Sequence, residues 1–492
     1  MTQLQLPTEI LELILCSFRP TCNIAESWRQ ARITGTSTHR SNCFKIYTQS
    51  LAICAQLRLV NRTFHDILTP LLYSLLVIPA QPQSLQKRRT IAAEHHPELI
   101  KAILFDGIVD AYISSATSHQ SDTVQILKPM LDSCTHLASI SIDLSKHPAW
   151  AINKVTMNDL FKDLPVPISS SGLGLTSLAL LQPNLAFLGA LIDGLGKRRM
   201  VDVKELLLSG ISLGAGIGPM QIPWTVPQAF SSLERLGIWL GRTLGRPSSP
   251  DALLQFLTQI LEPPPREDVD VSNFASATPS IPTITTSDTR SNRCQLRELT
   301  ISEGHKLLDI SILGRLFKIG NIGESLTTLQ LRLFPPISEY ITSTTFVTTN
   351  PSSSNSGGSW QLQPDIVTQF DRLPSSILQL CPRVTHFHYL TWCPESFLLN
   401  DLPGRIVELG VRIAEDLTME HPGGGGTGLG LPPSTLRSVE PLIQTVGEAQ
   451  YRRGLKRLYV EWGLQNRDEA DVENVRIACE TAGVVFLDHV DF

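Results

Sequence analysis

A short pattern of apolar positions, apolar-x-x-apolar-x-apolar, recurs along most of the chain. The ten copies are Ile100-x-x-Ile103-x-Phe105, Leu137-x-x-Ile140-x-Ile142, Leu175-x-x-Leu178-x-Leu180, Val203-x-x-Leu206-x-Leu208, Leu233-x-x-Leu236-x-Ile238, Leu296-x-x-Leu299-x-Ile301, Leu326-x-x-Leu329-x-Leu331, Val384-x-x-Phe387-x-Tyr389, Ile406-x-x-Leu409-x-Val411 and Leu455-x-x-Leu458-x-Val460. Side chains alternate along a strand, so the fourth and sixth residues of each copy point the same way, into one core. The pattern therefore predicts a series of short strands.

One such unit cannot fold alone. A buried Leu or Ile contributes roughly 1.5–3 kcal/mol, whereas ordering the backbone costs about 1–2 kcal/mol per residue. Stacking the units lets them share a core. Residues 251–261 and 371–380 have the pattern of intervening helices, and residues 470–492 predict a helix followed by a final strand at 484–487. The expected fold class is α/β with a parallel sheet.

The N-terminal part has a helical pattern instead. From Val60 onward, apolar residues recur at the three- and four-residue spacing of an amphipathic helix. Because proline disrupts a helix, we expect one helix to end near Thr69 and another to start at Pro70. Pro7 is expected to open an earlier helix, whose apolar side is formed by Ile10, Leu11, Ile14, Leu15 and Phe18.

These N-terminal residues resemble an F-box. The matching segments are Leu6-Pro7-x-Glu9-Ile10-Leu11, then Leu57-Arg58-Leu59-Val60-Asn61-Arg62-x-Phe64 and the trailing Thr69-Pro70-Leu71-Leu72-Tyr73-x-x-Leu76. The resemblance implies a helical module over residues 1–80 that binds a Skp-type adaptor and, through it, a cullin. The residues that it implies for adaptor binding are Leu6, Pro7, Ile10, Leu11, Leu59, Val60 and Phe64. An ordinary amphipathic helical N-terminus is the alternative.

The chain departs from the F-box pattern by an insertion at about residues 20–50, rich in Ser and Thr. We expect these residues either to form a loop or to be sequence that the gene model wrongly retains.

The repeated strands are similar to leucine-rich repeats, although the regular asparagine of those repeats is missing from most copies. The resemblance implies an irregular solenoid over residues 81–492. Stretches rich in Pro, Ser, Thr, Asn or Gly lie at about 263–293, 342–359 and 421–433. Such compositions bury too little apolar surface to offset ordering, so we expect mobile loops there.

The composition indicates an ordinary globular protein. The formal net charge of −5 gives no broad electrostatic reason to expect nucleic acid or a membrane surface as a partner. No apolar run is long enough for a membrane span, and no basic region precedes the first apolar residues. The nine cysteines include no C-x-x-C pair. We expect reduced, mostly buried thiols and a cytoplasmic or nuclear location.

Motifs for catalysis are missing from the sequence. Neither Gly-x-Ser-x-Gly nor His-Glu-x-x-His occurs. His386 and His388 would face the same side of one strand, a spacing that can hold a metal, but no third ligand is evident. We therefore expect polar residues on an open sheet face, with no metal, no cofactor and no enzymatic activity.

That sheet face is our candidate target-binding surface. If the fourth and sixth residues of each copy point inward, the third, fifth and seventh point outward. Exposed aromatic and Arg side chains have the composition of binding hot spots. The candidate residues are Arg235, Trp239, Arg332, His386, His388, Arg412, Arg457 and Tyr459. In an alternative register, slipped by one residue, Trp239 would belong to the core.

Together, the two resemblances imply a substrate-receptor subunit of a Skp–cullin–F-box ubiquitin ligase, with the helices on the adaptor and the repeats on an unknown protein target. The alternative is a repeat scaffold for protein–protein interaction without a ligase link.

Overall fold

A computed structural model of the chain describes most of the predicted helices and strands. The described residues are 7–16, 38–79, 96–106, 133–134, 136–143, 175–181, 188, 203–211, 230, 232–240, 250–261, 296–302, 310–332, 364–413, 436–452, 454–462 and 468–488. The chain divides into two compact units. The first comprises residues 1–242 and 259–294, and the second comprises residues 243–258 and 295–492.

The first unit combines N-terminal helices with a parallel sheet. Its described elements are α1 (Thr8–Cys16), α3 (Thr38–Leu57), α4 (Arg62–Tyr73), β1 (Leu75–Pro79), η1 (Pro97–Leu99), β2 (Ala102–Asp106), β3 (Ser139–Asp143), β4 (Ser177–Leu181), β5 (Glu205–Ile211) and β6 (Arg235–Leu240). Strands β1 to β6 pair in chain order, each parallel to the next. Every connection between them is therefore a crossover.

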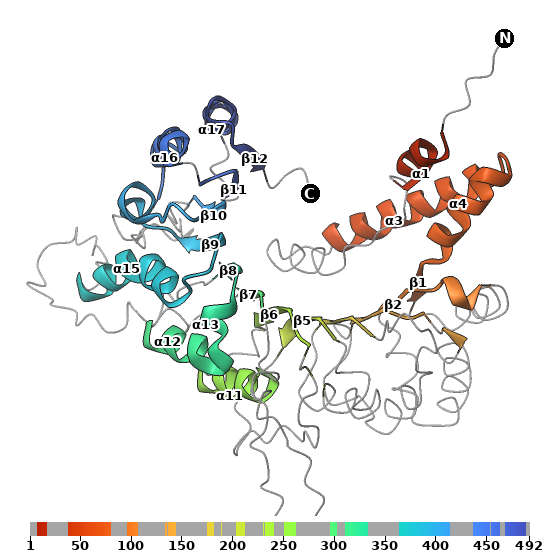
Figure 1. Cartoon of the computed structure of the whole chain (residues 1–492), viewed down its shortest axis with the longest axis horizontal. Helices are drawn as coiled ribbons and strands as arrows, with labels where there is room; N and C mark the ends of the chain where they lie inside the picture. Colours follow the sequence, from red (N-terminus) through yellow and green to blue (C-terminus); the bar gives the residue numbers. More distant parts are fainter. Residues whose placement is uncertain are drawn as a thin grey trace, which may run out of the picture. The chain divides into compact units, whose positions relative to one another are not determined.

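The second unit repeats this parallel arrangement with more helices. Its described elements are β7 (Glu298–Ser302), α12 (Ile310–Lys318), η3 (Ile319–Asn321), α13 (Ile322–Ser325), β8 (Thr328–Arg332), α15 (Pro364–Leu380), β9 (His386–Trp392), η4 (Phe397–Asp401), β10 (Glu408–Arg412), α16 (Glu440–Arg452), β11 (Arg457–Glu461), α17 (Glu469–Ala482) and β12 (Val485–Asp488). Strands β7 to β12 pair in chain order and in parallel. Helices α12, α15, α16 and α17 all lie on one side of these strands (Figure 1).

The core follows the repeated pattern. The fourth and sixth residues whose side chains the structure describes, all but Phe105, are buried, as in Leu206 and Leu208 of β5 (both 0% exposed) or Leu458 and Val460 of β11 (both 0% exposed). Equivalent residues of neighbouring strands are partners in the sheet, so that Leu178 lies beside Leu206, which lies beside Leu236. The predicted strands and their inward-facing residues are thus confirmed.

The helices predicted between strands are confirmed too. Helix α11 (Pro250–Leu261) covers the predicted 251–261, and α15 extends the predicted 371–380 toward its N-terminus. The predicted C-terminal helix and final strand correspond to α17 and β12. Gly483, with φ of 68°, ends α17 in the left-handed conformation that glycine adopts readily, and its N–H donates to the carbonyl groups of Cys479 and Glu480.

Three expectations about the first eighty residues are wrong. Helix α4 continues through Pro70 to Tyr73, so no new helix begins at the proline. Leu75 and Leu76, counted in the helical spacing that follows Pro70, instead lie in β1, because pairing with β2 satisfies the backbone groups of this segment. The predicted 20–50 insertion is not wholly a loop, since α3 begins at Thr38.

Several other expectations fall outside the described residues. These are the adaptor-binding role of Leu6, the rest of the insertion, and the mobile loops at 263–293, 342–359 and 421–433. None of the described helices combines the length and apolar character that a membrane crossing requires.

The cysteines whose side chains the structure describes are buried, as predicted. They are Cys54, Cys134, Cys381, Cys393 and Cys479, and none of these five forms a disulfide. Burial raises the pKa of the Cys134 and Cys381 thiols to about 12, so these groups stay protonated and act as apolar packing.

Candidate functional site

The N-terminal helices pack around a small core of their own. Leu15 of α1, Cys54 of α3 and Leu68 of α4 are buried against one another, with partly buried residues around them. Asn61 begins α4, since its side chain accepts a hydrogen bond from the Phe64 N–H at 2.9 Å. The three helices are thereby held in one arrangement.

Outside this core, the same helices expose large apolar side chains. Eight large hydrophobic residues are exposed in the part of the chain that the structure describes, and six of them belong to α1, α3 or the α3–α4 connection. These six, which we call the apolar surface, are Ile10 (43% exposed), Leu13 (75%), Ile14 (46%), Ile53 (39%), Leu59 (77%) and Val60 (64%). Exposed apolar area is unfavourable in water, and large patches of it are typical of interaction sites in general.

The apolar surface includes three of the predicted adaptor-binding residues, Ile10, Leu59 and Val60. Pro7, which was also predicted for adaptor binding, is exposed and lies three residues before Ile10. Leu11 and Phe64 are partly buried instead, and Phe64 packs against the core of the helices. Leu13, Ile14 and Ile53 were not predicted for adaptor binding, because a helical pattern does not show which of two apolar faces the protein itself covers.

The helices are joined to the first sheet by apolar contacts. Leu51 of α3 packs against a buried cluster on β1, β2 and β4 that consists of Val77, Leu104, Ala179 and Leu181. The module is therefore anchored to the strands that follow it.

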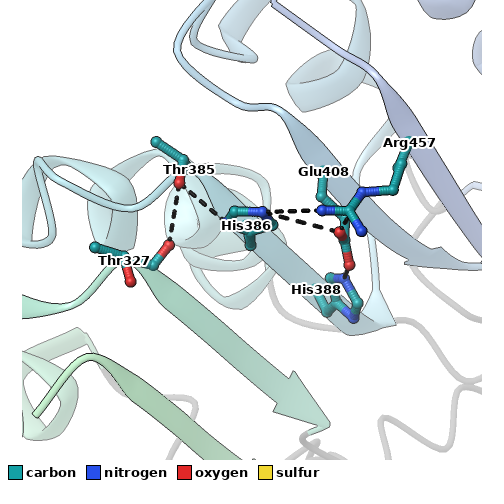
Figure 2. Close-up of polar contacts among 6 residues, drawn as sticks. All are labelled: Thr327, Thr385, His386, His388, Glu408 and Arg457. Atoms are coloured by element: carbon teal, nitrogen blue, oxygen red, sulfur yellow. Dashed lines mark hydrogen bonds and ion pairs between the residues drawn. The ribbon is translucent and has the colours of Figure 1, made fainter. Parts of the chain in front are cut away.

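A second candidate site lies on β9, β10 and β11 of the second unit. We call His386, His388, Glu408 and Arg457 the polar cluster (Figure 2). The Glu408 carboxylate contacts His388 Nε2 through Oε1 at 2.8 Å and Arg457 Nε through Oε2 at 2.9 Å. Glu408 lies on the central strand, so its carboxylate links the two flanking strands.

His386 contacts residues on both sides of its strand. Its Nε2 lies 3.3 Å from Arg457 Nη2 and 4.0 Å from Glu408 Oε2. Its Nδ1 lies 3.0 Å from Thr385 Oγ1, and that hydroxyl donates to the Thr327 carbonyl at 3.5 Å. A chain of hydrogen bonds thus runs from β11 across β9 to the residue preceding β8.

The polar cluster is arranged around an ionised carboxylate. The hydrogen bond from His388, helped by the positive charge of Arg457, holds the pKa of Glu408 below its ordinary value despite partial burial. The His388 ring also stacks on Tyr459 at 5.6 Å between ring centroids. This stacking needs Gly410 between the two strands, because a Cβ there would lie 2.7 Å from His388 Cγ.

A buried ionic group lies on the same strands. Arg332 of β8 (1% exposed) donates through Nη2 to Glu461 Oε1 of β11 (4% exposed). Arg412 of β10 approaches the same oxygen at 3.9 Å. Strands β9 and β10 separate the two partners, so this contact joins strands that are not neighbours.

Three expected exposures are wrong. Trp239 and Tyr459 are each 7% exposed and Arg332 is 1% exposed, although all three were predicted on an open face. The register has not slipped, since Ile238 beside Trp239 is in the core. Instead, the Trp239 ring lies over Gly237, where a Cβ would be 2.9 Å from Cη2. Position on the outer face therefore does not ensure exposure.

The remaining predicted target-binding residues are more accessible. Arg235 in the first unit is exposed and pairs with Glu205 at 3.5 Å. The side chain of Arg457 is 47% exposed, and the side chains of His386, His388 and Arg412 are partly exposed. The structure brings His386, His388 and Arg457 together through Glu408. Within the described residues, no group of three or more His, Cys, Asp or Glu side chains is placed to hold a metal ion.

Comparison with known proteins finds no family model that matches the chain and no significant match among curated proteins.

Proposed function

We propose that this chain is a substrate-receptor subunit of a Skp–cullin–F-box ubiquitin ligase. In this role the N-terminal helices bind a Skp-type adaptor, and the strands, as an irregular leucine-rich-repeat-like solenoid, hold a protein target. The subunit performs no chemistry itself. It raises the effective concentration of a target lysine near the ligase.

The apolar surface carries this proposal. Six of the eight exposed large hydrophobic residues in the described part of the chain belong to the short helical segment that resembles an F-box. Its most exposed members, Leu13, Leu59 and Val60, lie on α1 and at the α3–α4 connection. A partner that buried one such side chain completely would gain roughly 1.5–3 kcal/mol from it.

The sheet supports the second half of the role. Strands β9 to β11 present polar and charged side chains on the face opposite the leucine core, and the ion pairs of Glu408 hold several of them in place. A rigid, polar sheet face is suited to recognising another protein because few side chains lose freedom on binding.

Co-purification with a recombinant Skp-type adaptor tests the first half. We expect the full chain to form a complex with the adaptor, and the double variant Leu59→Asp/Val60→Asp to weaken it at least roughly hundredfold, because two buried apolar contacts are lost and two charges are placed in the interface.

The matched control is Ile477→Asp/Val485→Asp, which makes the same kind of change at the two exposed apolar residues of α17 and β12 (52% and 55% exposed). This control should retain adaptor binding. A folded wild-type chain that fails to bind the adaptor would refute the ligase role and leave the scaffold role, because strand-mediated target binding does not require the helices.

A further inference from the structure

The N-terminal ends of β9, β10 and β11 expose a group of basic side chains. We call this group, which consists of Arg383, Arg405, Lys456 and Arg457, the cationic edge. All four are exposed: Arg383 and Arg405 lie three residues before β9 and β10, Lys456 lies one residue before β11, and Arg457 begins β11. The strands are parallel neighbours, so their starting residues lie along the same edge of the sheet.

Backbone hydrogen bonds continue the sheet into this edge. The N–H of Val407 donates to the carbonyl of Thr385 at 2.8 Å, and the N–H of Lys456 donates to the carbonyl of Val407 at 2.8 Å. The three segments that carry the basic residues are therefore hydrogen-bonded to one another at the residues just ahead of the regular strands.

Acidic side chains do not balance this edge. The segments 381–386, 403–408 and 454–457 contain one carboxylate, that of Glu408. Both of its oxygens are already used, one by His388 and the other by Arg457. Arg383, Arg405 and Lys456 form no ion pair with any described residue. The edge is thus locally positive on a chain whose formal net charge is −5.

The equivalent edge of the first unit is different. There Lys204 pairs with Glu234 at 3.3 Å, and Arg235 pairs with Glu205 at 3.5 Å. These residues hold the same places before and at the start of β5 and β6 as Lys456 and Arg457 hold at β11. Lys204 and Arg235 are thus both paired in the first unit, whereas in the second unit Arg457 is paired with Glu408 and Lys456 has no ion pair with a described residue.

Two of the four side chains are held in place. Arg405 donates to the backbone carbonyls of Leu378 at 2.7 Å and Val384 at 3.3 Å, which fixes its guanidinium without neutralising its charge. Arg457 is fixed by Glu408. A ligand would find these charges already oriented, which reduces the entropy lost on binding.

We propose that the cationic edge binds a Glu/Asp-rich segment of a partner protein, which under the proposed function is the ligase target. The charges are spread across three strands about 4.8 Å apart. Single carboxylates distributed along an extended chain, at roughly 3.3 Å per residue, match that spread better than one phosphate group does. The assignment relies on the target-holding role of the strands and does not depend on adaptor binding.

Fluorescence anisotropy of labelled peptides against the full chain, without adaptor, tests this assignment. The probe is a fluorescein-labelled ten-residue peptide of alternating Glu and Ser, compared with its Lys/Ser counterpart, with a peptide carrying phosphoserine in place of Glu, and with a ten-nucleotide oligothymidine. We expect the Glu peptide to bind at low salt, to weaken as salt is added, and to bind more tightly than the other three probes.

The test variant is Arg383→Glu/Lys456→Glu, which leaves the Glu408–Arg457 pair intact. We expect it to weaken Glu-peptide binding roughly tenfold or more. The matched control, Lys318→Glu/Arg372→Glu, changes the charge equally on exposed residues of α12 and α15, and should stay within about twofold of wild type.

Equal weakening by the test and control variants would overturn the assignment, as would absence of Glu-peptide binding at low salt. Tighter binding of the phosphopeptide would overturn the choice of carboxylate, and tighter binding of oligothymidine would overturn the choice of a protein segment. Circular dichroism spectra and melting temperatures confirm that each variant is folded. Because no adaptor is present, none of these outcomes bears on the co-purification experiment.

Discussion

Removing Glu461 should cost more stability than removing its partner Arg332. Glu461 Oε1 accepts from Arg332, and Arg412 lies 3.9 Å from the same oxygen. Replacing Glu461 by Met leaves two guanidinium groups near one another with the carboxylate gone. Replacing Arg332 by Met leaves the carboxylate beside Arg412, whose side chain is 24% exposed and can still reach it.

The magnitude follows from the burial of the pair. Breaking a buried ion pair by removing one partner costs about 3–5 kcal/mol, since the remaining charge stays desolvated. We expect Glu461→Met at the upper end of that range and Arg332→Met at the lower end or below it. The double variant removes both charges, so its cost should fall short of the sum of the single costs by about 2 kcal/mol or more.

Urea denaturation of the wild type, the two single variants and the double variant measures these free energies of unfolding in a double-mutant cycle. Urea is chosen because it is uncharged and does not screen the ion pair. Costs that add within about 0.5 kcal/mol would show that the two residues do not interact. A cost below about 1 kcal/mol for Glu461→Met would show that its carboxylate is hydrated, which would contradict its burial.

The other predictions concern single contacts. The lowered pKa of Glu408 means that its ion pairs stabilise the fold above about pH 4.5 and are lost as the pH falls through that lowered pKa. The stability difference between wild type and Glu408→Gln, measured by urea denaturation, should therefore shrink below pH 4.5. A difference that does not change with pH would contradict this. Gly410→Ala should lower stability by about 1–3 kcal/mol in thermal melts, because its Cβ would lie 2.7 Å from His388 Cγ. Gly447→Ala in α16, where a Cβ would meet nothing within 4 Å, should instead stabilise by about 0.5–1 kcal/mol. Asn61→Ala removes the side-chain cap of α4 and should cost about 1 kcal/mol, whereas Asn61→Ser should restore most of it.

The strands could be predicted because one physical requirement dominates them. A strand that buries one face needs apolar residues at alternate positions, and the ten copies of the pattern meet that need, so the cores of β2 to β11 follow directly. Strand β1, by contrast, was not predicted. Leu75 and Leu76 continue a helical spacing from α4, and only the pairing with β2, which is set by residues 102–106, makes this segment a strand.

Pro70 shows a similar limit. A proline inside a helix removes one hydrogen bond, which favours ending the helix there. Helix α4 nevertheless continues past Pro70. Leu68, before the proline, is in the core of the N-terminal helices, and Leu71, after it, packs against that core. Packing between helices thus decides a boundary that local preference alone places too early.

The outer sheet face was the hardest part to predict, because its exposure depends on contacts between side chains that are distant in sequence. Alternation places Trp239, Arg332 and Tyr459 opposite the leucine core, yet each is buried: Trp239 packs against Gly237, Arg332 pairs with a residue of β11, and Tyr459 stacks on the ring of His388. Exposure on this face therefore depends on which neighbouring side chains reach over a residue as well as on alternation. The basic residues at the starts of β9 to β11, which form the cationic edge, are not covered in this way and stay exposed.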